Sequence, residues 1–427
     1  MSNFTLIGAT LADGSKANIA VKDGLIVSIG TETSGDSIDA SGLVALPGFV
    51  DLHTHLREPG FEQSETVKTG SQAAAKGGYT AVHAMANTHP VADTAGVVEQ
   101  VKALGDEAGY VQVQPIGAVT VGLDGKQLAE LGAMADSKAQ VRVFSDDGKC
   151  VHDPLLMRRA LSYVKNFGGV IAQHAQEPRL TENSQMHEGA VSTELGLAGW
   201  PAVAEESIIA RDVLLAEAAG SRIHICHLST AGSVEIVRWA KARGIKVTAE
   251  VTPHHLLLTD ELARSYDPVF KVNPPLRTQK DVTALREALI DGTIDIVATD
   301  HAPHPDESKD CEWNAAAFGM LGLETAASIA QSVLIDSGLS NWARFVEVMS
   351  SAPAAISGIP GQGRPLAVGE PANIALIDQS AKRVIHGGGA SKSDNQPYEG
   401  MTLPGAVVHT IFRGAFTVRD GKLVERG

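Results

Sequence analysis

The chain has 427 residues, of which 50 are acidic and 35 are basic, so its formal net charge is −15. This balance argues against a nucleic acid or an anionic membrane as the main ligand, because both would repel the chain. Hydrophobic residues make up 44% of the sequence, enough for a substantial core, and the length suits one large domain with an appendage.

Three cysteines, Cys150, Cys226 and Cys311, share no metal-finger spacing, and a sparse, odd count favours a reducing compartment over a disulfide framework. The first residues lack the basic and apolar segments of a signal peptide. No stretch approaches the run of about 18 apolar residues that a membrane span needs. The sequence therefore predicts a cytoplasmic protein without a membrane segment.

The two ends of the chain are predicted to form short strands. Residues 18–21 and 25–29 flank an Asp-Gly turn, which is typical of a β-hairpin, and a second Asp-Gly hairpin is expected over 418–424. A further strand is expected at 373–377. Because one hairpin is only marginally stable alone, we expect both ends to form one composite β-sandwich module, from residues 1–46 and 360–427.

The middle of the chain, residues 47–359, alternates apolar, β-branched runs with Ala- and Leu-rich segments of helical period. Eight segments are predicted strands: 44–52, 79–86, 110–119, 139–145, 169–174, 221–228, 246–252 and 294–299. Helices are predicted between them, among them 66–76, 93–104, 154–166, 203–219, 233–243 and 280–291. Eight β-then-α units indicate an α/β fold, a (β/α)₈ TIM barrel with buried parallel strands.

Catalytic residues of such a barrel sit at the carboxyl ends of its strands. Polar side chains follow most of the predicted strands at that end: His53, His55, Asn87, Asp146, Asp147, His174, His227, His254, His255, Asp300 and His301. This distribution indicates one site assembled from many strands.

His53 and His55 are two residues apart, so both side chains face the same side of a strand and can reach one ion. A lone histidine on an apolar strand is more often a hydrogen-bonded core residue, and that alternative also applies to His174 and His227. Because His53 and His55 occur as a pair, a metal site is the better interpretation for all four histidines. His224 lies an odd number of positions before His227, and we expect it to be structural.

Asp300 follows an apolar strand, where an acid is costly unless it is paired or binds a metal. The alternative is a helix N-cap. Four histidines and two aspartates, without a thiolate, suit Zn²⁺. Six groups exceed the needs of one tetrahedral ion, so one or two ions per subunit are expected, and two ions about 3.5–4 Å apart would use all six groups.

The order of these ligands resembles the amidohydrolase superfamily, and residues 49–60 resemble dihydroorotases of the bacterial type I class. The same resemblance is carried by segments 85–88, 144–148, 272–277 and 298–304, and it spans about residues 40 to 360. One position departs from the family, which usually has proline where this chain has Ala86.

The resemblance implies a role for each ligand. His53, His55 and Asp300 would bind the first ion, His174 and His227 the second, and Asp300 would also act as acid and base. Hydantoinases and allantoinases typically bridge the ions with a carboxylated lysine at the end of the fourth strand. Residues 141–145 contain no lysine, and two aspartates follow, as in type I dihydroorotases. Asp147 is the expected bridge rather than Asp146, because its spacing to His174 fits the family better.

The resemblance also implies the substrate contacts. Arg57 would pair with a substrate carboxylate. The other contacts implied are His55, Asn87, Asn273, His304, Phe318 and Gly319. A surface charge is the alternative for Arg57, and turn capping is the alternative for Asn273.

The implied activity is reversible cyclisation of N-carbamoyl-L-aspartate to L-dihydroorotate in de novo pyrimidine biosynthesis, by a metal-bound hydroxide with Asp300 moving the proton. Two alternatives remain: a hydantoinase- or allantoinase-like cyclic amidohydrolase, and a non-catalytic partner of a transcarbamoylase. The family also implies a homodimer or a complex with aspartate transcarbamoylase.

Overall fold

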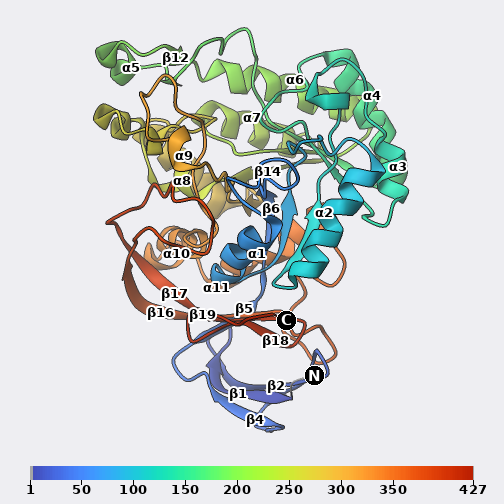
Figure 1. The fold of residues 1–427 in the computed structure, drawn as a ribbon, viewed down its shortest axis with the longest axis vertical. Coiled ribbons are helices and arrows are strands. Elements are labelled where there is room, and N and C mark those ends of the chain that lie inside the picture. The colour runs from blue at the N-terminus through green and yellow to red at the C-terminus, as the bar shows by residue number, and fades with distance from the viewer. Residues whose placement is uncertain (1–2, 427) are drawn as a thin grey trace.

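In the computed structural model, which describes residues 3–426, the two ends of the chain meet in one sheet of nine strands (Figure 1). The order is β19-β18-β17-β16-β5-β1-β2-β3, with β4 beside β1. The antiparallel pairing of β5 with β16 joins the two ends. The strands are β1 (Phe4–Thr10), β2 (Lys16–Lys22), β3 (Leu25–Gly30), β4 (Asp36–Asp39), β5 (Val44–Pro47), β16 (Ile374–Val384), β17 (Thr402–Phe412), β18 (Ala415–Arg419) and β19 (Lys422–Leu423).

Both predicted Asp-Gly hairpins are present. Asp23 and Gly24 have φ of 53° and 83°, and Asp420 and Gly421 have φ of 50° and 71°. Two successive positive φ values match the tight turns that join twisted antiparallel strands. The N-terminal strands lie below the C-terminal strands in Figure 1, and one hydrophobic cluster contains residues of both, including Leu6, Ile19, Ile374, Leu376 and Ile411.

The larger unit contains eight parallel strands, paired in two groups. One group is β6 (Phe49–Thr54), β7 (Tyr79–Ala84) and β8 (Gln112–Pro115). The other is β9 (Val143–Phe144), β10 (Val170–Gln173), β13 (Ile223–Ile225), β14 (Val247–Val251) and β15 (Ile296–Val297). Parallel bridges between Gly117 and Phe144 and between Thr54 and His301 join the two groups at both edges, so the pairing returns to its start. The expected α/β class is confirmed.

One predicted strand is wrong in part. Residues 44–52 are divided between β5, in the terminal sheet, and β6, in the ring of parallel strands. The chain changes sheets at Gly48, where an added Cβ would lie 2.3 Å from Cγ2 of Thr80. A glycine allows this close approach, which a purely apolar pattern does not reveal.

The six predicted helices are present as α1 (Val67–Lys76), α2 (Ala95–Ala108), α4 (Pro154–Val164), α6 (Val203–Ala219), α7 (Ala231–Ala242) and α9 (Gln279–Asp291). Thr66, Asp153, Thr230 and Thr278 each accept a backbone hydrogen bond at a helix start, which satisfies a donor that the helix itself leaves free. Shorter elements were not predicted: α3 (Leu131–Asp136), α5 (Ala190–Leu195), α8 (Pro253–Leu257), α10 (Ala326–Gln331), α11 (Trp342–Val346), α12 (Ala352–Ser357), β11 (Met186–His187) and β12 (Gly199–Trp200).

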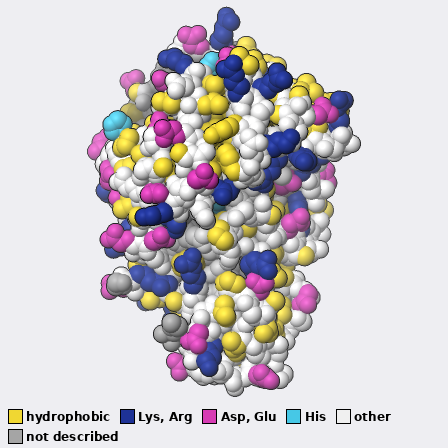
Figure 2. Space-filling view, turned by 90° about the vertical axis from the view of Figure 1, so that its right-hand side faces the viewer, with side chains coloured by type: hydrophobic (Ala, Val, Ile, Leu, Met, Phe, Trp, Pro, Cys, Tyr) yellow, Lys and Arg dark blue, Asp and Glu magenta, His cyan; other side chains and the backbone are white. Residues whose placement is uncertain are grey.

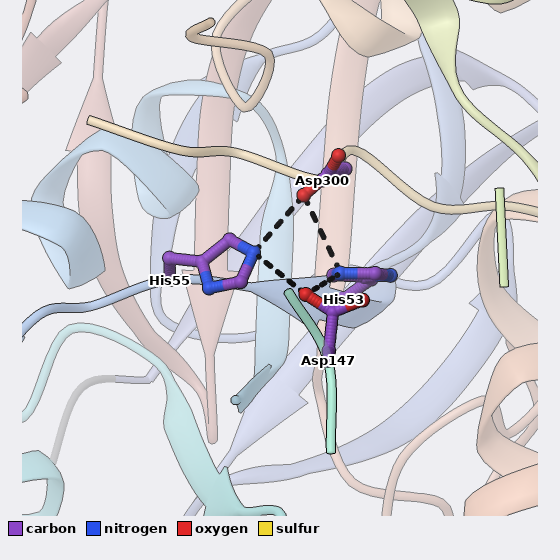
Figure 3. A group of neighbouring side chains, drawn as sticks. All are labelled: His53, His55, Asp147 and Asp300. Carbon is purple, nitrogen blue, oxygen red and sulfur yellow. Dashed lines mark hydrogen bonds and ion pairs between the residues drawn. The ribbon is translucent and has the colours of Figure 1, made fainter. Parts of the chain in front are cut away.

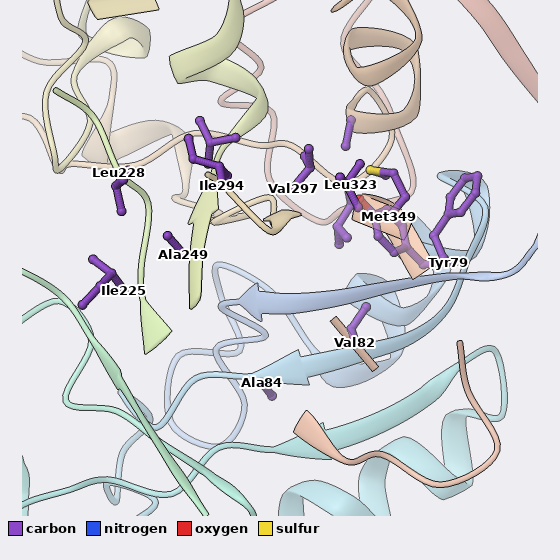
Figure 4. Close-up of a cluster of buried hydrophobic side chains, with 14 of the residues drawn as sticks. Tyr79, Val82, Ala84, Ile225, Leu228, Ala249, Ile294, Val297, Leu323 and Met349 are labelled. Carbon is purple, nitrogen blue, oxygen red and sulfur yellow. The ribbon is translucent and has the colours of Figure 1, made fainter. Parts of the chain in front are cut away.

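Alternate residues of the parallel strands belong to different cores. Val82 and Ala84 of β7, Ile225 of β13 and Val297 of β15 pack with residues of the surrounding helices (Figure 4). A second cluster, which includes Leu52 of β6, contains other strand residues. The ring of strands is therefore filled by side chains, with buried polar residues such as His83 and Glu250 inside the strands as well as at their ends.

Charged side chains of both signs cover the face shown in Figure 2, with hydrophobic side chains between them. Acidic and basic side chains are therefore intermixed on that face. Among the described residues, no helix has the length and apolar character needed to cross a membrane.

Candidate metal centre

The six predicted metal ligands come together at the carboxyl ends of the ring strands. His53 and His55 belong to β6 and the residue after it, and the others follow β9, β10, β13 and β15. All six are buried, with at most 5% of their surface exposed: His53, His55, Asp147, His174, His227 and Asp300.

Asp147 lies between two groups of ligands. Its Oδ2 is 3.3 Å from Nε2 of both His53 and His55. Its Oδ1 is 3.2 Å from Nδ1 of His174 and 3.3 Å from Nε2 of His227. Each carboxylate oxygen thus faces a different pair of histidines, which is the arrangement that a bridging carboxylate needs.

Asp300 completes the first group (Figure 3). Its Oδ1 is 3.0 Å from Nε2 of His55 and 3.3 Å from Nε2 of His53. The ligand atoms of His53, His55, Asp147 and Asp300 all lie within 4.8 Å of one another, and so do those of Asp147, His174 and His227.

The donor set fits a divalent metal. Among the described residues, Nε2 of His53 makes no hydrogen bond and faces only the carboxylates of Asp147 and Asp300 at 3.3 Å, while Nδ1 donates to Oε1 of Glu250 at 2.6 Å. Nε2 of His174 donates to Oε1 of Gln176 at 2.7 Å, which leaves Nδ1 facing Asp147. A metal-binding histidine usually donates its other N–H in this way, and imidazole with carboxylate suits Zn²⁺ and similar ions.

The carboxylates of the site are ionised. Burial alone would raise the pKa of Asp147, but His53, His174 and His227 hold that pKa well below its usual range. Burial opposes ionisation of Asp300 as well, and His53 and His55 hold its pKa low. Metal ligands must be deprotonated, and the two ionised carboxylates meet that requirement.

Asp146 faces away from the ligand groups. Its Oδ1 accepts hydrogen bonds from the backbone N–H groups of Val119 and Thr120, at 2.8 and 3.0 Å, and its Oδ2 accepts one from the Thr120 hydroxyl. The side chain therefore joins β9 to the segment after β8.

Four of the predicted substrate contacts lie together beside the first ligand group. Arg57 donates through Nε to the carbonyl of Pro303 at 3.1 Å, and its Nη2 is 3.4 Å from Nε2 of His304. His304 Nε2 donates to the carbonyl of Phe318 at 2.8 Å. An added Cβ at Gly319 would lie 2.8 Å from His304 Nε2, so only glycine fits there.

Arg57 and His304 differ in charge. Burial lowers the pKa of Arg57 to about 10, so the guanidinium stays protonated near neutral pH. Burial, helped by Arg57 and Lys309, lowers the pKa of His304 to about 3, so its imidazole stays neutral. The pair offers one cation and one neutral ring to an anionic ligand.

Of the two predicted asparagines, Asn87 contacts a metal ligand directly and Asn273 is linked to one through Gln176. Asn87 accepts a hydrogen bond from Nδ1 of His55 at 2.9 Å. Asn273 donates through Nδ2 to Oε1 of Gln176 at 3.2 Å, and Gln176 in turn binds His174. The Oδ1 of Asn273 is buried and has no hydrogen-bond partner among the described residues, which leaves it available to a ligand.

Comparison with known proteins identifies the family. A family model described as "Dihydro-orotase-like" matches residues 42–233. The dihydroorotase of Streptomyces coelicolor is 66% identical, covering 99% of this chain and 100% of the relative. The dihydroorotase of Mycobacterium tuberculosis is 56% identical, and the match covers 96% of this chain and 97% of the relative. The chain belongs to the dihydroorotase family of amidohydrolases.

Solved structures extend this likeness to the fold. The L-hydantoinase (dihydropyrimidinase) of Arthrobacter aurescens matches this dihydroorotase-family chain with a TM-score of 0.88 at 27% identity, covering 100% of this chain and 98% of that one. A dihydropyrimidinase of Brevibacillus agri matches with a TM-score of 0.84 at 23% identity, and the match covers 99% of this chain and 96% of that one. Family members and hydantoinases therefore share one architecture.

The sequence prediction missed several residues of this dihydroorotase-family site. Glu250 binds His53 and also accepts from Nε2 of His224 at 2.9 Å. Burial would raise the pKa of Glu250, but the two histidines lower it to about 2. The sequence did contain a signal for Glu250, because an acid inside the apolar segment 247–251 needs a buried partner. His254 is buried, and neither of its ring nitrogens has a hydrogen-bond partner within residues 3–426; the sequence placed it at a strand end but gave it no role.

Proposed function

We propose that the chain is a zinc-dependent dihydroorotase, which interconverts N-carbamoyl-L-aspartate and L-dihydroorotate in de novo pyrimidine biosynthesis in the cytoplasm. Relatives that are 55–66% identical over nearly the full chain carry that name. The observation that carries the proposal is the position of Arg57, a half-buried cation beside the two ligand groups that Asp147 connects.

The ligands divide between one or two Zn²⁺ ions. His53, His55 and Asp300 would hold the first, His174 and His227 the second, and Asp147 would serve both. A bound ion would polarise the amide carbonyl and lower the pKa of an attacking water, which is about 15.7 in bulk.

Arg57 and His304 provide the substrate specificity in this proposal. Dihydroorotate carries a carboxylate on its ring, and a guanidinium pairs with a carboxylate through two parallel hydrogen bonds. His304, Asn87 and the backbone at Phe318–Gly319 would bind the same end of the substrate. Asn273, with its free Oδ1, would bind the ring amide.

Asp300 moves the proton. Its carboxylate stands beside the histidine pair and is held ionised, so it can accept the proton of the attacking water. It would then donate that proton to the leaving ring nitrogen, and the same steps in reverse close the ring of N-carbamoyl-L-aspartate.

The architecture supports this proposal. We interpret the ring of eight parallel strands as a metal-dependent (β/α)₈ barrel over residues 47–359, with residues 1–46 and 360–427 as the composite module. A homodimer and a complex with aspartate transcarbamoylase remain predictions of the family resemblance.

A substrate comparison tests the proposal. With zinc bound, the chain is expected to hydrolyse L-dihydroorotate at least about 100-fold more efficiently, in kcat/KM, than hydantoin, allantoin or dihydrouracil, because a lost charge-assisted contact costs about 1.5–3 kcal/mol and misplaces the ring. Dihydrouracil is the matched control, since it has the same ring without the carboxylate. Preferred turnover of hydantoin or allantoin would replace the proposal by the hydantoinase-like alternative.

A further inference from the structure

A segment of the terminal module reaches the site from outside the ring of strands. Residues 391–395, in the connection between β16 and β17, contact the loop that follows β6. The hydroxyl of Ser391 and the backbone N–H of Lys392 both donate to the Glu65 carboxylate, the latter at 3.0 Å. The Ser393 hydroxyl donates to the carbonyl of Ser64 at 2.6 Å. We call residues 391–395 the strap.

The end of the strap contacts the loop that follows β15. Oδ1 of Asn395 accepts the backbone N–H of His304 at 3.1 Å. Its Nδ2 donates to the carbonyls of Ala302 and Gly319, at 2.9 and 3.2 Å. Its own carbonyl accepts from the backbone N–H of Leu321 at 3.1 Å. The Asn395 side chain, only 5% exposed, thus binds both ends of the loop from residue 302 to residue 319.

These contacts place the backbone of the residues that surround Arg57. His304 lies 3.4 Å from the Arg57 guanidinium and binds the Phe318 carbonyl. The strap also binds the loop after β6, on which Arg57 lies, through Ser64 and Glu65. It therefore ties together the two loops whose side chains meet at the proposed carboxylate contact.

A planar amide is the group that these contacts require. It presents an acceptor to one N–H and two donors to two carbonyls in a single buried plane. An aspartate of the same shape would keep the acceptor but lose both donors, and its charge would face the carbonyls of Ala302 and Gly319. Alanine would leave all three backbone groups without this partner.

We infer that Asn395 is a positioning residue for the substrate carboxylate: it holds His304 and Gly319 in register with Arg57, so the terminal module completes the substrate pocket. This inference rests on the proposed function and adds to it a residue that acts through others rather than by touching substrate.

Asn373 offers a matched control in the same module. It is 8% exposed and also makes three side-chain hydrogen bonds: Nδ2 donates to the Gly361 carbonyl at 2.9 Å and to Gln362 Oε1 at 3.3 Å, and Oδ1 accepts from Arg413 N at 2.8 Å. None of these partners belongs to the metal centre or the substrate contacts. The alanine variants of Asn373 and Asn395 should therefore lose similar stability.

The experiment compares Asn395→Ala, Asn395→Asp and Asn373→Ala with the wild-type holoenzyme. Both Asn395 variants are expected to raise KM for dihydroorotate about tenfold, with kcat changed less than about threefold, because loss of such buried partners is worth roughly one tenfold step. The dissociation constant of orotate, a planar ring with the same carboxylate, should rise by the same factor in calorimetry. Asn373→Ala should leave both constants unchanged.

Two results would overturn the inference. One is unchanged KM and orotate affinity in the folded Asn395 variants. The other is an equal loss in Asn373→Ala, which would assign the effect to module stability. The isosteric Asn395→Asp variant keeps the test usable where the alanine variant does not fold. A wild-type chain that binds orotate but does not turn over dihydroorotate would instead contradict the proposed function.

Discussion

Replacing Asp300 by asparagine is expected to lower kcat for dihydroorotate hydrolysis by about 10²–10⁴-fold, the usual contribution of a positioned acid–base group. The amide keeps the shape of the side chain and an oxygen facing His53 and His55, but it cannot take up a proton. Zinc content, measured by elemental analysis of the purified variant, should therefore stay close to that of the wild-type protein.

Asp295→Asn is the matched control, because Asp295 lies at the other end of the same strand segment and pairs with Lys241 at 2.7 Å, far from the ligand groups. It should keep wild-type kcat. Near-wild-type turnover by Asp300→Asn would refute the acid–base role, and loss of zinc together with turnover would reduce Asp300 to a ligand.

Removal of Asp147 is expected to have a second large effect. Asp147→Ala takes one oxygen from each ligand group at once, since Oδ2 faces His53 and His55 and Oδ1 faces His174 and His227. Bound zinc should fall below one ion per chain, and kcat should fall by about 10³-fold or more, because metal polarisation is worth several kcal/mol.

The neighbouring aspartate should behave in the opposite way. Asp146→Ala removes hydrogen bonds to Val119 and Thr120, so its melting temperature should fall while zinc content stays unchanged. Each such bond contributes about 0.5–1.5 kcal/mol. Measuring zinc and thermal unfolding for both variants separates the two roles. If Asp146→Ala lost the metal and Asp147→Ala kept it, the assignment of the bridge would be reversed.

The regular helices and strands could be predicted because their apolar patterns extend over many residues. Helices such as α4 and α9 repeat apolar residues over several turns, and seven predicted strands contain the observed ones. Elements such as β11, with two residues, or α8, with five, are too short to show a period. The break at Gly48 depends on Thr80, which is distant in sequence, so no local pattern marks it.

Some residues of the candidate site could likewise be predicted from local sequence, and others could not. His53 and His55 lie two residues apart at the end of one strand, and the other ligands follow strands whose order the fold class implies. Glu250 carried a local signal, a buried acid in an apolar strand. Asn395 carried none, because its partners His304 and Gly319 lie in another unit of the fold, and a single sequence does not show that contact.

The most direct test of the central claim is turnover of L-dihydroorotate by the metal-free chain as zinc is added, alone and with aspartate transcarbamoylase. Hydrolysis is expected to appear with zinc and to saturate at no more than about two ions per chain, because two ions can share the Asp147 carboxylate. A folded, zinc-binding chain that neither opens L-dihydroorotate nor closes N-carbamoyl-L-aspartate under either condition would contradict it.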